Sequence, residues 1–407
     1  MLTELSRVGA SVFRLNFSHG THEDHEKVIK IIHEINDQYN ANKAILMDLQ
    51  GPKIRINQIK GGAVEIEPGG SLTIAIDERE GNSESVSTTY KEIVNDVNAG
   101  DTILIDDGNI ELKVKEIKNQ EVHTEVIHGG TLKSRKGINL PQTRVSAPSL
   151  TEKDKKDLEF GLQFDPEWVA LSFVRKAEDI QVLRDIINKS GKHTKIVAKI
   201  EKPEALDNID EIIEATDAVM VARGDLGVEI AMQDVPIVQK LLVKKCKIVG
   251  KPVIIATQMM ESMINNPRPT RAETNDVANA ILDGADAVML SAESASGDYP
   301  VLAVTAMSKV IHAVEEQAES IYNYDIEDEN STTRTNDLLV RSACHLSQYV
   351  NAKAIIGMTK RIDKTLDQIK ELLVKEKFLN KGDVIVNTAS MPAHWDGHTN
   401  MMKIDEV

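Results

Sequence analysis

Two short apolar segments of this chain run directly into charged residues whose types and spacing could do chemistry. The first segment delivers Lys199 and Glu201, and the second delivers Arg223 and Asp225. Alternate side chains of a β-strand point to the same side, so each pair is predicted to face one way. One lysine and two carboxylates could then meet beyond the ends of neighbouring strands. Such a group would hold a divalent cation and an anionic substrate together, as chemistry on a phosphorylated acid requires.

Seven continuous apolar segments are predicted to be the strands that position these residues. A segment with helical spacing follows most of them, and this alternation is typical of parallel βα units. The pattern predicts an α/β fold built on a (β/α)8 barrel of the TIM type. Nothing before Ser11 supplies an eighth strand, because Thr3–Val8 has the spacing of a helix. The seven segments lie at residues 11–15, 44–49, 168–174, 196–200, 218–221, 253–256 and 287–290.

The carboxyl ends of these strands carry the candidate functional residues, since barrels of this type place their active sites there. Oxygen ligands suited to Mg²⁺, cations suited to phosphate, and hydroxyl groups able to relay a proton are all present. A single charged residue at a strand end is usually a solvated loop residue. Seven strands that all end this way favour a shared site. In chain order the residues are Arg14, Asn16, Ser18, Asp48, Ser172, Lys199, Glu201, Arg223, Asp225, Thr257, Gln258, Ser291 and Glu293.

Two regions of the chain depart from the barrel pattern. Between residues 50 and 166 the apolar residues alternate with period two between glycine- and proline-rich turns, which indicates a small antiparallel β-barrel inserted as a lid. After about residue 308 the pattern indicates a separate α/β domain, preceded by an acidic linker at 323–334. We therefore expect a catalytic barrel at 1–52 and 149–307, a lid domain at 53–148 and a C-terminal domain at 308–407.

Composition limits the class of protein. The 407 residues carry a formal net charge of −16, which argues against a nucleic-acid-binding protein but not against a small anionic substrate. No secretory signal is recognisable, and no apolar run is long enough to span a membrane. Cys246 and Cys344 suggest no disulfide framework. We expect a cytoplasmic protein with no nucleic-acid or membrane partner.

Three further sequence features have a structural explanation or limit how a ligand could be bound. His19, His22 and His25 match neither zinc-finger nor His-Glu-x-x-His spacing, so a polar helix start is preferred to a metal site. The segment Thr270–Glu273 is a capping box and predicts the start of a helix. The chain has neither Gly-x-x-x-x-Gly-Lys-[Ser/Thr] nor Gly-x-Gly-x-x-Gly. A nucleotide would therefore be held in some other way.

Longer motifs around these candidates resemble the signature segments of the pyruvate kinase family. They are Phe13–Gly20, Ile196–Glu201, Val221–Glu229, Ala256–Met263 and Pro267–Glu273, and the resemblance extends over nearly the whole chain. It implies transfer of the phosphoryl group from phosphoenolpyruvate to ADP, giving pyruvate and ATP in glycolysis. It further implies Mg²⁺ as cofactor, with Mn²⁺ as a substitute, and a homotetramer.

The resemblance also implies roles at the reaction centre. Glu201 and Asp225 would ligate Mg²⁺, Lys199 would stabilise the transferring phosphoryl group, and Arg14 would bind phosphate oxygens. A physical argument agrees, because phosphoryl transfer depends on positioning and charge neutralisation more than on covalent chemistry. A closing lid would exclude water and prevent hydrolysis.

The remaining implied roles concern the substrate acid and the nucleotide. The backbone at Gly224 and Asp225, together with Thr257, would hold the substrate carboxylate, and Lys199 would also contact the substrate. Thr257 and Ser291 are candidates for the relay that protonates the enolate. The candidates for binding nucleotide phosphates and ADP are Arg55, Lys136, which would reach in from the lid, and His19.

One position bears on monovalent cations. Asn16, Ser18 and Asp48 match residues of a monovalent-cation site in the family, but Lys53 stands where K⁺-dependent members usually carry a glutamate. A lysine there resembles the K⁺-independent members. The ammonium group of Lys53 would take the electrostatic role of the missing cation, so we expect that K⁺ is not required.

The chain differs from the pyruvate kinase family in two places, and two alternative functions remain open. The family's first barrel strand has no counterpart before Met1, and a block of residues is expected to be missing after Lys360. One alternative is a Mg²⁺-dependent, enolate-forming barrel lyase or aldolase, and the other is a truncated non-catalytic homologue. The lid with Arg55 and Lys136 favours the kinase over the lyase. The presence of Lys199 and both carboxylates argues against a non-catalytic homologue.

Overall fold

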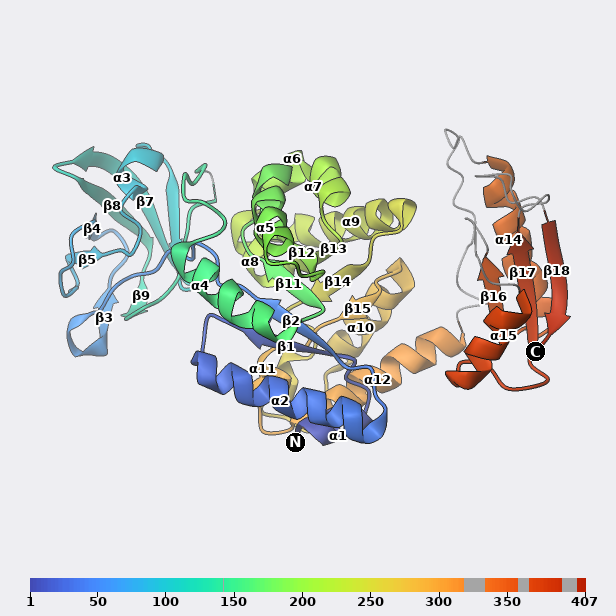
Figure 1. Cartoon of the computed structure of the whole chain (residues 1–407). Coiled ribbons are helices and arrows are strands. Elements are labelled where there is room, and N and C mark those ends of the chain that lie inside the picture. The colour runs from blue at the N-terminus through green and yellow to red at the C-terminus, as the bar shows by residue number, and fades with distance from the viewer. Residues whose placement is uncertain (142, 318–333, 358–365, 390–400) are drawn as a thin grey trace. The chain divides into compact units, whose positions relative to one another are not determined.

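The computed structural model describes residues 1–141, 143–317, 334–357, 366–389 and 401–407 (Figure 1). The chain divides into two compact units, Met1–Ile321 and Tyr322–Val407. The first unit holds a parallel sheet, its helices and the inserted β domain, whereas the second is a smaller α/β domain. None of the described helices is long and apolar enough to cross a membrane. Residues 323–333 of the predicted linker lie outside the described residues.

A single parallel sheet of seven strands forms the centre of the first unit, and each strand coincides with a predicted apolar segment. Spatial order follows chain order, as expected for successive βα units. Among the described residues, β1 and β15 are the edge strands and no eighth strand joins them. The strands are β1 Val12–Asn16, β2 Ala44–Asp48, β11 Trp168–Leu171, β12 Lys195–Ile200, β13 Ala218–Ala222, β14 Val253–Ala256 and β15 Ala287–Val288.

Helices follow most of these strands, and three helices of this unit, α2, α4 and α10, begin at capping boxes. In α2 the Thr21 side chain accepts the Asp24 backbone N–H, and in α10 Thr270 and Glu273 form the box predicted from the sequence. The segment between β12 and β13 forms two helices that meet at Asn208. The helices are α1 Leu2–Arg7, α2 His22–Tyr39, α4 Glu152–Gly161, α5 Ala177–Lys189, α6 Pro203–Asp207, α7 Ile209–Ala215, α8 Arg223–Glu229, α9 Val235–Val249, α10 Arg271–Asp283, α11 Ala292–Ala295 and α12 Pro300–Glu316. Short 3₁₀ helices lie at Leu162–Phe164, Met232–Asp234 and Glu261–Ile264.

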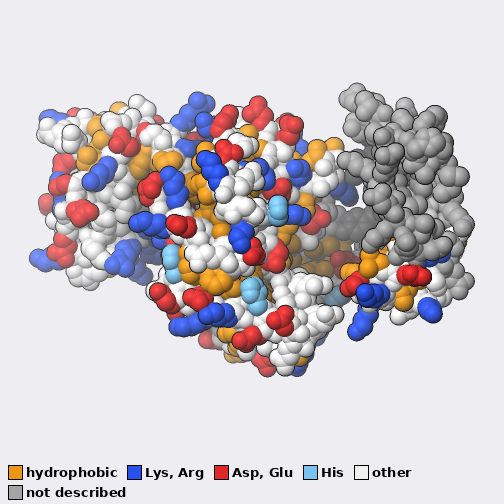
Figure 2. Space-filling model, viewed as in Figure 1, with side chains coloured by type: hydrophobic (Ala, Val, Ile, Leu, Met, Phe, Trp, Pro, Cys, Tyr) orange, Lys and Arg blue, Asp and Glu red, His pale blue; other side chains and the backbone are white. Residues whose placement is uncertain are grey.

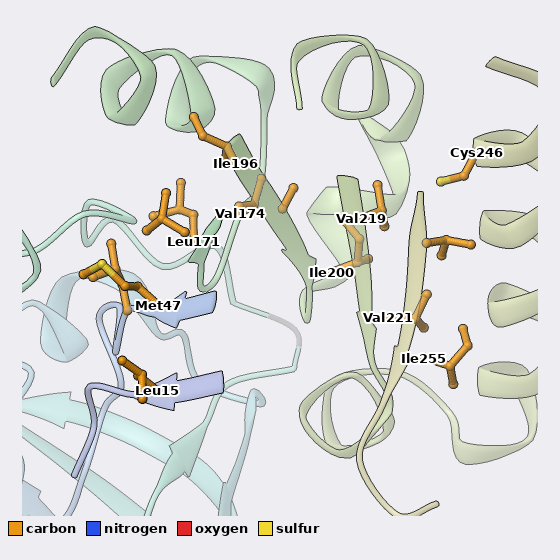
Figure 3. Packing of buried hydrophobic residues seen from close by; sticks show 14 of the residues in the cluster. Leu15, Met47, Leu171, Val174, Ile196, Ile200, Val219, Val221, Cys246 and Ile255 are labelled. Carbon is orange, nitrogen blue, oxygen red and sulfur yellow. The ribbon is translucent and has the colours of Figure 1, made fainter. Parts of the chain in front are cut away.

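Aliphatic side chains pack on both faces of the sheet. Figure 3 shows Val219 and Val221 of β13 packed in the same cluster as Ile255 of β14 and Cys246 of α9. The alternate residues of β13, which include Met220, belong to a separate cluster on the other face. The strands are therefore buried on both sides, which explains why the sequence shows continuous apolar runs rather than alternation.

The inserted β domain contains a six-stranded sheet, ordered β10-β6-β7-β8-β4-β5, and a two-stranded ladder of β3 with β9. All its strand pairs are antiparallel except β4 with β5, which is parallel. The strands β4, β6, β7 and β8 carry the predicted alternation of apolar residues. The elements are β3 Ala63–Ile66, β4 Ser71–Ala75, β5 Ser85–Ser87, α3 Ile93–Asp96, β6 Thr102–Ile105, β7 Ile110–Lys118, β8 Glu121–His128, β9 Gly130–Lys133 and β10 Ile138–Asn139, with a 3₁₀ helix at Lys60–Gly62.

The second unit is an α/β domain at Tyr322–Val407, whereas the predicted start at residue 308 lies inside α12 of the first unit. It contains α14 Arg334–Tyr349, β16 Ala354–Gly357, α15 Leu366–Lys375, β17 Val384–Ala389 and β18 Met401–Glu406. The strands β16 and β17 pair in parallel, and β18 pairs with β17 in the antiparallel sense. The block expected to be missing after Lys360 concerns residues 358–365, which lie outside the described part of the chain.

Candidate functional site

The carboxyl ends of β1, β2, β11, β12 and β13 surround a cleft of about 450 Å³. Polar and charged side chains form most of its lining, and most of the predicted site residues are among them. The lining consists of Arg14, Asn16, Ser18, His19, Asp48, Leu49, Gln50, Lys53, Arg55, Ser172, Phe173, Lys199, Glu201 and Asp225. The tertiary structure thus brings together residues from five strand ends that are far apart in the sequence.

Lys199 is the centre of a buried charge network in this cleft. Its Nζ lies 3.1 Å from Asp48 Oδ1, 2.9 Å from Glu201 Oε1 and 2.8 Å from Ser172 Oγ. Its side chain is only 12% exposed. Burial alone would lower the pKa of Lys199, but the carboxylates of Asp48, Glu201 and Asp225 raise the pKa above its ordinary value. The ammonium group therefore stays charged at neutral pH.

Asp48 is shared between Lys199 and Arg14. Arg14 donates to Asp48 Oδ2 through Nε at 2.6 Å, while Lys199 contacts the other carboxylate oxygen. Burial would raise the pKa of Asp48, but the two cations hold the pKa below its usual value. One carboxylate thus fixes the separation of two positive groups at the strand ends. The sequence assigned Asp48 only to a monovalent-cation site and did not indicate this second contact.

Glu201 and Asp225 are two carboxylates that could hold a metal ion. Glu201 Oε2 accepts the backbone N–H of Phe173 at 2.7 Å, and Asp225 Oδ1 lies 3.6 Å from Lys53 Nζ. Burial and the like charge of Asp225 raise the pKa of Glu201, against the effect of Lys199. Such mutual repulsion favours a cation between the two groups, and their hard oxygens suit Mg²⁺.

The number of carboxylates limits how such an ion would be held. Among the described residues, no group of three or more His, Cys, Asp or Glu side chains is arranged to bind a metal. An ion on Glu201 and Asp225 would thus complete its coordination with water or substrate oxygens, as Mg²⁺ commonly does. The residues present fit this mode of binding.

The prediction that Arg223 and Asp225 face the same side is wrong. Strand β13 ends at Ala222 and α8 begins at Arg223, so the two residues lie on a helix rather than a strand. Each helical residue turns the side chain by about 100°, which puts residues two apart on nearly opposite sides. Asp225 lines the cleft, whereas Arg223 forms an ion pair with Asp276 of α10 at 2.8 Å.

Seven predicted residues lie outside the lining of the cleft, namely Arg223, Gly224, Thr257, Gln258, Ser291, Glu293 and Lys136. Gly224 precedes Asp225 in the chain and donates its backbone N–H to Thr257 Oγ1 at 2.7 Å. The backbone N–H of Ser291 donates to Glu293 at 2.7 Å, and Lys136 pairs with Asp106 of the lid at 2.7 Å. Thr257 is thus connected to the cleft through Gly224.

The other nucleotide and monovalent-cation candidates line the cleft. Arg55 donates to the carbonyl of Arg135 at 3.0 Å, so its guanidinium is partly held by the lid. Asn16 Oδ1 accepts the backbone N–H of Ser18 at 3.1 Å. Lys53 also lines the cleft, and its Nζ lies 3.6 Å from Asp225 Oδ1.

Sequence reasoning missed the contacts that join the lid to the barrel. Arg175, which follows β11, donates through Nη2 to the Ala147 carbonyl at 2.7 Å. Asn139 of β10 donates to Glu229 Oε1 at 2.9 Å, and Lys202 pairs with the same oxygen at 2.7 Å. Arg175 could have been noticed as a charged residue at a strand end, but its carbonyl partner has no signature in the sequence.

Charges on the surface are mixed. On the face drawn in Figure 2, Lys and Arg side chains are interspersed with Asp and Glu side chains over the lid and the barrel. No continuous basic stripe is visible on this face.

A parallel barrel with a lysine–carboxylate cluster at its strand ends and an inserted β domain defines an enzyme of phosphoryl transfer. Residues 1–304 match the family model for the pyruvate kinase barrel domain, and residues 282–405 match the model for the pyruvate kinase alpha/beta domain. The chain belongs to the pyruvate kinase family.

Individual relatives agree with this assignment. Pyruvate kinase of Geobacillus stearothermophilus is 40% identical over 454 residues, which cover 100% of this chain and 77% of the relative. Pyruvate kinase of Clostridium perfringens is 40% identical over 458 residues, covering 100% of this chain and 96% of the relative. The crystal structure of a pyruvate kinase from Cryptosporidium parvum superposes with a TM-score of 0.84 at 33% identity, covering 100% of this chain and 92% of that chain.

These relatives decide between the functions left open by the sequence. The protein is a phosphotransferase with the pyruvate kinase function, and the lyase or aldolase alternative is not favoured. The family uses phosphoenolpyruvate and ADP and generally needs Mg²⁺.

The Geobacillus alignment spans 454 positions against the 407 residues of this chain, a difference of 47. That relative therefore carries residues at positions where this chain has none.

The loop that leads from β1 to α2 is held by a stacked histidine. The His25 ring stacks on Phe17 with centroids 4.2 Å apart, and His25 Nε2 lies 3.0 Å from the His19 carbonyl. This loop carries Ser18 and His19 of the cleft. Burial lowers the pKa of His25 below its ordinary value, so the folded state favours the neutral imidazole.

We predict that acid weakens folding through His25. Because the folded pKa is lowered, the unfolded state binds the proton more readily, and stability falls as the pH drops below about 6.5 and through the folded pKa. The variant His25→Gln should lose this part of the pH dependence in urea unfolding between pH 5 and pH 8. The exposed His33 on α2 offers the control His33→Gln. Equal pH dependence in His25→Gln and the unsubstituted protein would contradict the prediction.

Proposed function

We propose that transfer of the phosphoryl group from phosphoenolpyruvate to ADP takes place in the cleft at the carboxyl ends of β1, β2, β11, β12 and β13. The observation that carries this proposal is the buried ammonium group of Lys199, held between Asp48 and Glu201 at 3.1 and 2.9 Å. A fixed positive charge that needs no rearrangement during the reaction is what charge stabilisation in a transition state requires.

Arg14 and Lys199 are proposed to bind the phosphate of phosphoenolpyruvate. Both are anchored on the same Asp48 carboxylate, so their donors are held at a set separation. The guanidinium of Arg14 provides further N–H groups suited to phosphate oxygens. Lys199 then faces the phosphoryl group as its negative charge spreads during transfer.

Glu201 and Asp225 are proposed to hold the catalytic Mg²⁺, and Mn²⁺ would fit the same oxygens. An ion held by these two carboxylates would neutralise charge on the phosphoryl and enolate oxygens. The backbone N–H of Phe173 holds one oxygen of Glu201 and so orients the carboxylate. The carboxylate of Asp225 is paired with Lys53 only at 3.6 Å, which leaves it available for the ion.

The substrate acid and the enolate are assigned to the neighbourhood of Thr257. Its hydroxyl accepts the Gly224 N–H and donates to the Ala256 carbonyl at 2.6 Å, which fixes its direction. We propose that Gly224, Asp225 and Thr257 hold the substrate carboxylate. Thr257 is favoured over Ser291 as the start of the proton relay, because Thr257 contacts the residue next to Asp225.

The nucleotide is assigned to the side of the cleft that adjoins the lid. Arg55 and His19 line this side and would contact ADP. Lys136 would reach the nucleotide phosphates only after its ion pair with Asp106 at 2.7 Å is exchanged for them. Closure of the lid domain, proposed at residues 53–148, would bring about this exchange and exclude water.

The central role of Lys199 predicts the effect of removing its charge. The variant Lys199→Met should lower kcat by about 100- to 1,000-fold in a coupled assay of ATP formation from phosphoenolpyruvate and ADP. Lys155→Met, which breaks the exposed pair of Lys155 with Glu152, is the matched control and should keep full activity. Equal, near-zero rates in the Lys199→Met variant and the unsubstituted protein would instead indicate a non-catalytic homologue.

We further propose that the reaction does not require K⁺. The support is the ammonium group of Lys53, which lines the same cleft as the monovalent-cation candidates Asn16, Ser18 and Asp48 and lies 3.6 Å from Asp225 Oδ1. Turnover in buffer free of K⁺ should change by less than about twofold when KCl is added, whereas Lys53→Met should lose activity that KCl partly restores. A many-fold rise on adding K⁺ to the unsubstituted protein would overturn this proposal.

The oligomer is proposed to be a homotetramer. On α9 the side chains of Ile237, Leu241 and Ile248 are 67%, 47% and 50% exposed, and their spacing places them on one face of the helix. A row of exposed aliphatic residues is typical of an interface, and self-association of identical chains is usually symmetric. Light scattering should give four chains per particle, and Ile237→Asp should reduce that number. A monomer at micromolar concentration in the unsubstituted protein would contradict the proposal.

A further inference from the structure

Arg223 contacts the backbone that follows β14 and is directed away from the cleft. Its Nη1 and Nη2 donate to the two carboxylate oxygens of Asp276, each at 2.8 Å. Nη2 also donates to the carbonyl of Thr257 at 2.8 Å and to that of Gln258 at 3.2 Å. One guanidinium therefore joins α8, α10 and the loop after β14.

The two residues whose carbonyls Arg223 contacts have an unusual backbone. Thr257 has φ of 70° and Gln258 has φ of 54°, both in the left-handed region. This conformation is unfavourable for residues with a side chain and most of all for a β-branched one such as Thr257. Strained backbone of this kind persists only where surrounding contacts hold it, and it concentrates at functional sites. Arg223 supplies the contacts to both backbone carbonyls at this place.

The strained conformation sets the position of the Thr257 hydroxyl. In this backbone state Oγ1 lies 2.7 Å from the Gly224 nitrogen and 2.6 Å from the Ala256 carbonyl oxygen. A Cβ atom added at Gly224 would lie 3.2 Å from Thr257 Oγ1, so only a small residue at 224 permits this approach. If Thr257 and Gln258 relaxed to negative φ, the hydroxyl would leave Gly224.

We propose that Arg223 is a positioning residue of the phosphoryl-transfer reaction, which holds the strained Thr257–Gln258 backbone so that the Thr257 hydroxyl meets the substrate acid. The inference rests on the proposed role of Thr257. Arg223 does not itself touch the substrate. Because Thr257 serves the substrate acid, loss of Arg223 should affect phosphoenolpyruvate and leave ADP binding unchanged.

A lysine cannot replace this arginine. Arg223 serves four oxygen acceptors from one planar group, and that geometry depends on the fork of the guanidinium. Lysine offers its donors from a single atom and could hold the Asp276 carboxylate or the loop carbonyls, but not both in the same arrangement. The variant Arg223→Lys thus keeps the charge and tests the fork.

Arg184 of α5 provides a matched control on the same barrel. It donates to the carbonyl of Ala215 at 2.8 Å and to Asp217 Oδ2 at 3.1 Å, at the amino end of β13. It therefore also joins a carbonyl to an aspartate, but at the end of the sheet remote from the cleft. Arg184→Lys should lower the melting temperature without changing the kinetic constants.

The test measures kinetic constants and melting temperatures of Arg223→Lys and Arg184→Lys. Arg223→Lys should lower kcat/KM for phosphoenolpyruvate by about 100-fold, as small misplacements of positioned groups do, while KM for ADP stays unchanged. Arg184→Lys should keep kcat/KM within about twofold. Equal losses of melting temperature with unaltered kcat/KM in both variants would overturn the inference and leave a purely structural role. A parallel loss for both substrates in Arg223→Lys would also overturn it.

A double-mutant cycle separates this inference from the proposed role of Thr257. If Arg223 acts through Thr257, Arg223→Lys should have little further effect on kcat/KM in a Thr257→Val background. Normal kinetics in Thr257→Val alone would refute the role of Thr257. Impaired Thr257→Val with additive effects of the two substitutions would refute only the role assigned to Arg223.

Discussion

The site depends on one buried ammonium group, that of Lys199. An unpaired charge would be too costly to bury, so its partners Asp48, Glu201 and Ser172 must be delivered to within hydrogen-bond distance by separate strands. Those partners are themselves buried and need the lysine in return. The network can form only if β2, β11 and β12 lie side by side in register, which the parallel sheet ensures. The charge network of the site therefore depends on the same strand pairing that packs the barrel.

Around this network, the backbone supplies as much of the site as the side chains do. The N–H of Phe173, at a φ of 56°, orients Glu201, and the carbonyls of Thr257 and Gln258 bind Arg223. In each case a left-handed residue directly follows or lies near a strand end. A buried sheet is rigid enough to hold such conformations, because its side chains pack tightly on both faces. The strain is thus kept where positioning is needed.

The lid is connected to the barrel by polar contacts of the same kind. Arg175 binds a carbonyl of the chain segment that returns from the lid, and Asn139 reaches Glu229, which Lys202 also binds. Polar contacts can be exchanged for contacts with substrate or water at a modest cost in free energy. They suit the closure proposed for this domain better than a large apolar interface would.

The sequence by itself determined the seven strands, the inserted β domain, the family and most of the residues in the cleft. It could do so because strands buried on both faces are continuous apolar runs, and because the charged residues follow them directly. Prediction from the sequence failed where a side chain binds a backbone atom of a distant segment. It also failed where α8 begins directly after β13, at a position expected to continue the strand. Arg223 illustrates this, since its orientation was decided by the start of α8 rather than by strand alternation. Only the tertiary structure could decide that Asp48 is shared by two cations, that Arg223 faces Asp276 and that Ser291 lies outside the cleft. The physical reason is that a hydrogen bond between distant segments forms only when its two atoms are placed to within a few tenths of an ångström. The pattern of residue types along the sequence does not contain such positions.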